Sequence, residues 1–301
     1  RAAWLGKAYK VVEAVMMGCC VAMAVLFWAA VFIATRPDWG AVFTGVFIPQ
    51  PIPEYEDWAL KAAPDIVGVP PWWLVGTALG SLGGGIQDYV GYVGMLKEKG
   101  WGVLKSKLAE EIKMIYYELP KGSKVPLPEE PDKVRKLMTW VNGVKADVVI
   151  SFFLVFFVTI ATAVLSVEIL RPQHLIPSGL SLVEYQARWL EAIHPALSIM
   201  WWVGAFAALW GTFYGGVFET YTYTTWELLR TTKRFANLST NTVRKYLWPY
   251  LIVVGSIYVL SGWQLPWLAG FASALTHLFG LAIWGLALLY CDQKLLPKPY
   301  K

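Results

Sequence analysis

The sequence predicts an all-α integral membrane protein with six transmembrane helices. Of its 301 residues, 56% are hydrophobic and only 16% are charged, and the mean hydropathy is +0.47, which is too apolar for an ordinary soluble domain. A helix needs about 20 residues to cross roughly 30 Å of hydrocarbon. Six stretches meet this requirement, and we expect them to form one transmembrane domain over residues 1–301: 11–35, 72–96, 146–169, 193–218, 247–262 and 266–291.

The charged residues between these stretches predict how the chain is oriented. Loops 97–145 and 219–246 carry eleven and five Lys or Arg residues, whereas loops 36–71 and 170–192 carry two each. Positively charged loops tend to stay in the cytoplasm, so we expect a multi-pass protein with both termini and loop 97–145 on the cytoplasmic side. The net charge of +5 then faces anionic lipid headgroups of the bilayer, and no nucleic-acid partner is needed to explain it.

The long loop 97–145 is expected to contain amphipathic helices. Apolar residues recur in it at helical spacing between 104 and 119, which predicts a helix lying on the inner membrane face. The stretch PDKVRKLMTWVNG, residues 131–143, predicts a second short helix before the third span. Its plainest interpretation is a solvated surface helix, and the alternative is a regulatory element.

The second span contains an unusual group of residues. Residues 76–94 read GTALGSLGGGIQDYVGYVG, and each glycine in a helix interior costs about 1 kcal/mol relative to alanine. Gly83, Gly84 and Gly85 therefore predict a break, whose backbone must be buried in protein or line a watery cavity. Carbonyl oxygens at the break, the Gln87 amide and the Asp88 carboxylate together predict a cation site.

A purely structural interpretation competes with this one. Gly76, Gly80 and Gly84 are spaced four residues apart, a pattern that lets two membrane helices approach closely without any break. That pattern does not explain Gly83, Gly85 or the carboxylate of Asp88.

Two other polar residues in the spans are candidates for an ion path or for coupling. Asp147 begins the third span and either caps that helix or serves an ion path. His277 lies deep in the sixth span and is a proton carrier, an axial ligand or a hydrogen-bonded packing residue. A haem site needs facing histidine pairs. The chain has only three His in all, so the sequence gives little support to a haem site. The chain carries no catalytic sequence motif, so we expect neither an enzyme nor a bound cofactor.

Several segments resemble one family of transporters. Residues 10–53, which contain the sequence RPDWGAVFTGVFIPQPIP, resemble the fifth helix and following loop of the natural resistance-associated macrophage protein (NRAMP) metal transporters. The span 72–96 then falls on the family's broken sixth helix, ADVVISFFLVFFVTIATA on the seventh and LEAIHPALSIMWWVGAFAALWG on the eighth. The last two spans match the ninth and tenth by order.

The resemblance implies the latter part of a LeuT-like inverted-repeat fold with a broken second span. The family's first four helices have no counterpart, so we expect the missing N-terminal helices in the same gene or in a separate chain. The family's metal-binding Met falls on Gly84, and its histidines fall on Ile86 and Gly91. Losing the thioether while gaining Gln87 and Asp88 favours hard cations such as magnesium or manganese.

These observations lead to a primary hypothesis and two alternatives. The primary one is transport of a divalent cation by alternating access, with Gly83, Gly84, Gly85, Gln87 and Asp88 as this chain's share of the metal site. The first alternative is a non-transporting membrane scaffold subunit of a larger complex. The second is a pigment- or haem-binding electron-transfer subunit.

Overall fold

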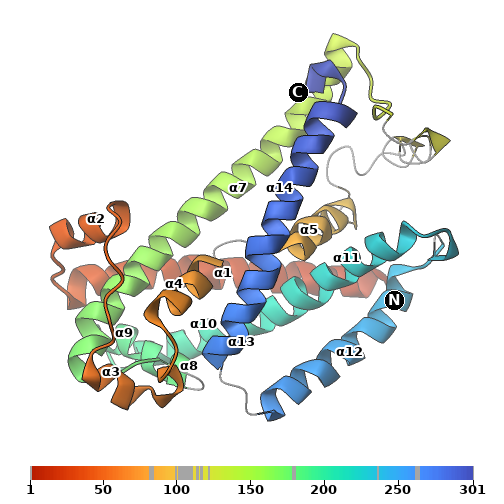
Figure 1. The fold of residues 1–301 in the computed structure, drawn as a ribbon. Coiled ribbons are helices and arrows are strands. Elements are labelled where there is room, and N and C mark those ends of the chain that lie inside the picture. Colours follow the sequence, from red (N-terminus) through yellow and green to blue (C-terminus); the bar gives the residue numbers. More distant parts are fainter. Residues whose placement is uncertain are drawn as a thin grey trace. The chain divides into compact units, whose positions relative to one another are not determined.

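A computed structural model describes most of the chain, and every regular element in the described part is a helix (Figure 1). The described residues are 2–80, 85–98, 100, 111–112, 115, 118–120, 123–177, 181–235, 237–261 and 265–300. Within them no strand occurs. The predicted all-α class is confirmed.

Four helical runs among the described residues are long and apolar enough to cross a membrane. They are Ala14–Ala34, Pro131–Gln173, Leu197–Arg230 and Trp267–Leu295. Their presence supports a multi-pass membrane protein. The predicted spans 72–96 and 247–262 are not among these four, so the count of six stays a prediction.

The helices before the predicted break are α1 (Ala2–Ala34), α2 (Trp39–Phe47), α3 (Asp57–Ala62), the 3-10 helix η1 (Pro64–Ile66) and α4 (Pro71–Gly80). Helix α2 begins at an Asp38 cap, whose carboxylate accepts the N–H groups of Gly40 at 2.9 Å and Ala41 at 3.2 Å. An acidic cap at a helix start satisfies amide groups that would otherwise lack a partner.

The third predicted span is part of a much longer helix. Helix α7 runs from Pro131 to Leu165 without interruption and continues through the π-helix η3 (Ser166–Leu170) and the 3-10 turn η4 (Arg171–Gln173). The prediction of a separate short helix at 131–143 is therefore wrong. One glycine, Gly143, stands between the two patterns, and its cost of about 1 kcal/mol does not end a helix that is favourable on both sides.

The fourth span also continues past its predicted end. Helix α10 (Leu197–Gly211) leads through the π-helix η5 (Thr212–Phe218) into α11 (Glu219–Arg230), so three further turns that we assigned to a loop are helical. The remaining helices are α5 (Ile86–Glu98), α8 (Ser181–Gln186), α9 (Arg188–Glu191), η6 (Lys233–Phe235), α12 (Thr240–Leu260), α13 (Leu265–Ser273), η7 (Ala274–Phe279), α14 (Gly280–Tyr290), η8 (Cys291–Leu295) and η9 (Lys298–Tyr300).

The chain packs into two compact units. The first comprises residues 1–75, 151–216 and 264–267, and the second comprises 76–150, 217–263 and 268–301. The prediction of one transmembrane domain over the whole chain stays a prediction.

The first unit has an aromatic core between α1 and the segment α9 to α10. Phe27 packs edge-on against Trp189, with ring centroids 5.6 Å apart, and also contacts Trp201. The Trp201 indole N–H donates to the carbonyl of Val183 at 2.7 Å. Buried aromatic rings with a satisfied N–H combine large apolar burial with a fixed orientation, so this cluster holds α1 against α10.

A polar clamp in the same unit joins the start of α3 to η4 and the residue that follows it. Glu56 forms an ion pair with Arg171 and accepts the Trp58 indole N–H at 2.5 Å. The Trp58 ring stacks on His174, with centroids 4.8 Å apart. His174 has a left-handed backbone (φ 55°) that ends the helical turn. The hydrogen bonds from Trp58 and Arg171, together with the nearby positive charge, lower the pKa of the Glu56 carboxyl.

The second unit is built on the close approach of α5 and α11, which lie side by side (Figure 1). A Cβ atom at Gly91 would lie 2.5 Å from the carbonyl oxygen of Thr220, and one at Gly94 would lie 2.7 Å from the Cβ of Tyr223. These separations are far below contact distance, so the two backbones meet where α5 has no side chains. Small residues at such crossings are typical of membrane helix pairs.

The clamp generates a prediction about pH. A carboxyl whose pKa is lower in the folded state stabilises the fold above its unfolded pKa, and this contribution is lost as the pH falls through the folded value. We expect the free energy of unfolding of the native chain to decrease as the pH falls below about 4.5, the ordinary pKa of a Glu carboxyl. This decrease should be larger than that of the Glu56→Gln variant, which has no carboxyl at this position to protonate. Thermal unfolding of both proteins between pH 3 and pH 7 measures the difference, and parallel curves would contradict the clamp.

The glycine contact generates a second prediction. Gly91→Ala forces α5 away from the α11 backbone, and we expect it to reduce the free energy of unfolding by about 1–3 kcal/mol, the usual cost of overpacking. Gly255→Ala in α12 is the matched control, because no atom lies within 4 Å of its added methyl group. Denaturant unfolding in detergent compares the two, and an equal effect of both substitutions would show that the close approach is not needed.

Candidate functional site

The described residues place a non-helical glycine at the predicted break. Helix α4 (Pro71–Gly80) is described as far as Gly80 and α5 begins at Ile86, while Gly85, just before α5, is buried and non-helical. Gly83 and Gly84, two members of the predicted metal site, lie outside the described residues. At the helix start the Asp88 N–H donates to the Gly85 carbonyl at 2.9 Å. In return the Asp88 Oδ2 accepts the Gly85 N–H at 2.8 Å, so the carboxylate caps its own helix in the manner of a capping box.

Gln87 explains why a glycine is required at position 85. The Gln87 carboxamide folds back over the glycine, and a Cβ at Gly85 would lie 2.3 Å from its Oε1. Its Nε2 donates to the Asp88 Oδ2 over 3.4 Å. The predicted residues Gly85, Gln87 and Asp88 are therefore brought together, in one turn at the start of α5.

Residues of α11 contact this turn from a neighbouring helix. The Thr224 hydroxyl donates to the backbone carbonyl of Gln87 at 2.5 Å, and the Tyr221 phenol interacts with the Gln87 side chain and with the charge of Asp88. On its other side, α5 contacts α14 through Tyr89, whose ring stacks with that of Trp284 at 6.4 Å. Oxygen atoms from a carboxylate, a carboxamide and a phenol thus gather at the start of α5.

Sequence reasoning missed the α11 residues because we assigned residues 219–246 to a loop. A signal was present in the run ETYTYTT, residues 219–225. Thr220 and Thr224 are four residues apart and so share one helix face, and both are buried. Continuing the helical period beyond residue 218 would have placed them.

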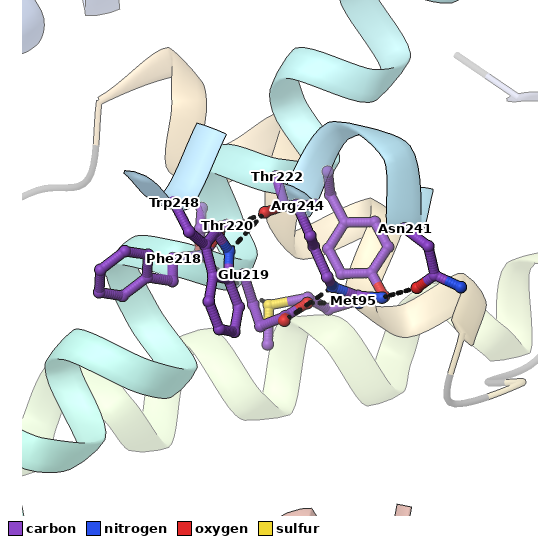
Figure 2. A network of polar contacts seen from close by, with 9 residues as sticks. Met95, Phe218, Glu219, Thr220, Thr222, Asn241, Arg244 and Trp248 are labelled. Carbon is purple, nitrogen blue, oxygen red and sulfur yellow. Dashed lines mark hydrogen bonds and ion pairs between the residues drawn. The ribbon is translucent and has the colours of Figure 1, made fainter. Parts of the chain in front are cut away.

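A polar network on α11 also ties α12 into this unit (Figure 2). Arg244 binds Glu219 in a two-pronged ion pair, with Nε to Oε1 at 3.0 Å and Nη2 to Oε2 at 2.6 Å. Arg244 also donates to Asn241 at 3.0 Å and to the Tyr223 hydroxyl at 3.2 Å. The side chains of Arg244 and Glu219 are only 24% and 14% exposed. Ion pairs of this planar geometry are stronger and more directional than single contacts.

Buried threonines of α11 contact polar atoms on the neighbouring helices (Figure 2). Thr222 is fully buried and accepts the indole N–H of Trp248 at 3.2 Å, while the Trp248 ring packs on Phe218 with centroids 5.0 Å apart. The Thr220 hydroxyl approaches the Met95 sulfur at 3.9 Å. Helix α11 therefore contacts α5 on one face and α12 on another through polar bonds.

The two candidate coupling residues lie in other elements. Asp147 accepts a hydrogen bond from the Tyr92 hydroxyl at 2.7 Å, which links α7 to α5 one turn after Asp88. Asp147 lies well inside α7, which begins at Pro131, so the interpretation of Asp147 as a helix cap is wrong. His277 belongs to the π-helix η7 (Ala274–Phe279), and its side chain lies outside the described part.

The chemistry of the group at the start of α5 is that of hard oxygen donors. In the part of the chain that the structure describes, no three His, Cys, Asp or Glu side chains lie close enough together to hold a metal ion. A cation at this position would bind the carboxylate of Asp88, with the amide and hydroxyl oxygens of Gln87 and Tyr221 beside it. Such donors suit magnesium, calcium or manganese.

Comparisons with known proteins add no relative: no protein-family model, no curated protein and no solved structure matches the chain. The resemblance to NRAMP transporters stays a prediction from the sequence.

The ion pair of α11 and α12 generates a prediction. We expect Glu219→Gln to reduce the free energy of unfolding by about 3 kcal/mol, because it leaves the Arg244 charge without its partner in a poorly hydrated position. The double variant Glu219→Gln/Arg244→Gln should lose less than the sum of the two single variants. Denaturant unfolding of all four proteins gives the coupling free energy, and strictly additive losses would show that the pair contributes nothing.

Proposed function

We propose that this chain is part of a membrane transporter for a divalent cation, with magnesium or manganese favoured. The observation that carries the proposal is the non-helical, buried Gly85 followed by Asp88 in the first turn of α5. A carboxylate within an apolar segment is costly and is usually functional. An interrupted helix that presents such a group is how many transporters bind their ions.

The bonding of Asp88 supports a specific arrangement for the cation. Its Oδ2 is used by the Gly85 N–H and by Gln87, so we propose that Oδ1 faces the cation together with the carboxamide oxygen of Gln87. The Tyr221 hydroxyl would add a third oxygen from α11. Asp147, bonded to Tyr92 one turn further along α5, would then lie on the path of the ion.

The rest of the proposal follows the family resemblance. We propose six spans and a LeuT-like architecture, in which helices outside this chain complete the ligand shell of the cation. Alternating access would arise from the rocking of one helix bundle against another around the bound ion. One carboxylate is too few ligands for a tight divalent site, so this proposal requires further ligands from helices outside this chain.

A second function, a non-transporting scaffold subunit, is favoured by a different observation. Asp88 already has a structural role as a helix cap, and Gly91 and Gly94 bring α5 and α11 into close contact. Glycines that serve close packing, and a carboxylate that serves capping, would suit a subunit that only holds a larger complex together.

Uptake measurements decide between these two functions. We expect vesicles containing the full-length protein to take up radiolabelled manganese or to show magnesium influx by a fluorescent reporter. Asp88→Asn/Gln87→Ala should reduce uptake at least about tenfold, because even outer-shell partners of a metal contribute 10–100-fold. Asp132→Asn, which alters an exposed carboxylate at the start of α7, is the control and should leave uptake unchanged.

The scaffold function predicts the opposite pattern. No cation uptake by the native protein, no thermal shift with added cation and a stoichiometric co-purifying partner would rule out the transporter. Uptake that the double variant leaves unchanged would rule out Gln87 and Asp88 as its cation site.

A further inference from the structure

Helix α2 (Trp39–Phe47) is apolar although it belongs to a segment that we assigned to a loop between spans. Residues 39–53 contain no Asp, Glu, Lys, Arg or His, whereas the next helix of the same segment, α3, carries Asp57 and Lys61. None of the nine residues of α2 is buried in the structure. A helix that is apolar but not covered by its own protein is typical of a membrane environment.

The side chains of α2 divide between two faces. Large apolar side chains recur every three or four residues and so share one face of the helix: Trp39, Val42, Phe43, Val46 and Phe47. Small residues occupy the other face: Gly40, Ala41, Thr44 and Gly45. Phe43 and Phe47 are 62% and 60% exposed, and their ring centroids are 4.7 Å apart. These two rings form an exposed apolar edge.

Contacts with α1 place this helix relative to a candidate membrane span. The Trp39 ring stacks on Trp28, with centroids 6.5 Å apart, and lies 5.9 Å from the ring of Phe32. Both partners belong to the last part of the span Ala14–Ala34. At 1.5 Å per residue, Trp28 lies about 9 Å before the end of that span. Helices in the bilayer boundary, where acyl chains meet headgroups, are buried by about 5–10 Å, which matches the level of α2.

The exposed edge of α2 also adjoins a second candidate span. The Phe47 ring lies 6.5 Å from that of Phe156 in α7, within the uncharged run 148–167. Phe32 of α1 and Phe153 of α7 are exposed as well. The edge is therefore continuous with the apolar faces of two helices that are long enough to cross a membrane, and lipid hydrocarbon is what such faces contact.

Both ends of the uncharged stretch return to charged residues. Asp38 caps α2 at one end, and Glu54 follows the stretch at the other. Nine residues are too few to cross a bilayer, so both ends lie at the same membrane surface. Residues 48–53 are exposed and non-helical, and three of the six are proline. Proline has no backbone N–H, which lowers the number of unpaired donors beside hydrocarbon.

We propose that α2 is a membrane anchor that lies in the bilayer boundary, with Phe43 and Phe47 inserted among the lipid acyl chains. The small face, which includes Thr44 and Gly45, is then directed toward the headgroups, and the charged ends stay in water. The partner of this surface is the lipid itself. The anchor is independent of the proposed cation transport, because it shares no residue with the candidate cation site.

The test measures the accessibility of nitroxide spin labels on the full chain in phosphatidylcholine nanodiscs, after the three native cysteines are replaced by serine. Labels at Phe43→Cys and Phe47→Cys should collide with dissolved oxygen more than with a water-soluble nickel chelate, at a depth of about 5–10 Å. A label at Gly45→Cys should favour the nickel chelate, because it lies on the small face. Its added side chain meets no atom within 4 Å.

Two matched positions calibrate the result. A label at Lys61→Cys, on exposed α3, should favour the nickel chelate severalfold, and one at Val25→Cys, 63% exposed in the span of α1, should favour oxygen. Ratios at Phe43 and Phe47 equal to that at Lys61 would place α2 in water. Few collisions with either reagent would place it under another protein helix, and oxygen preference at Gly45 as well would place it wholly in hydrocarbon. Each of these three results would overturn the proposal.

A second measurement needs no substitution. A lipid-soluble diazirine photolabel, applied to the native protein in the same nanodiscs, should modify residues 39–47 and leave residues 57–62 unmodified. Mass spectrometry of the resulting peptides separates the two helices. Equal modification of both, or modification of neither, would contradict the anchor.

Discussion

The contact between α5 and α11 is the constraint on which the second unit depends. Gly91 and Gly94 let the α5 backbone approach the carbonyl of Thr220 and the Cβ of Tyr223 more closely than any side chain would allow. The same approach brings Thr224 to the carbonyl of Gln87 at one end and Trp226 to Lys97 at the other. A larger residue at either glycine would therefore disturb the candidate cation site and the contact between Lys97 and Trp226 together.

Helix α11 carries an unusual density of buried polar groups for a segment that continues an apolar helix. An unpaired polar group away from water costs free energy, and the threonines avoid this cost by bonding to Phe218, Trp248 and Gln87. Glu219 and Arg244 neutralise each other. Such pairing makes the joint between α11 and α12 directional, because the bonds form in one register only, whereas apolar contacts would permit sliding.

The carboxylate of Asp88 illustrates how a structural role and a functional role compete for the same atoms. Capping the Gly85 N–H holds the start of α5 in place, and it uses lone pairs that a cation would also seek. Because Gln87 lies folded over Gly85, a shift of its carboxamide would change the exposure of both residues. Binding of an ion and the conformation of this turn are therefore expected to be linked.

The sequence by itself determined the helical class, the apolar runs and the position of the non-helical Gly85, because each follows from local composition and from the cost of glycine in a helix. Only the tertiary structure decided that Asp147 bonds to Tyr92, and that Tyr221 and Thr224 lie beside Gln87. These pairings join residues 55 to 137 positions apart. No local pattern encodes them, because they depend on how closely two helix backbones can approach, and that distance is set by the packing of both helices at once.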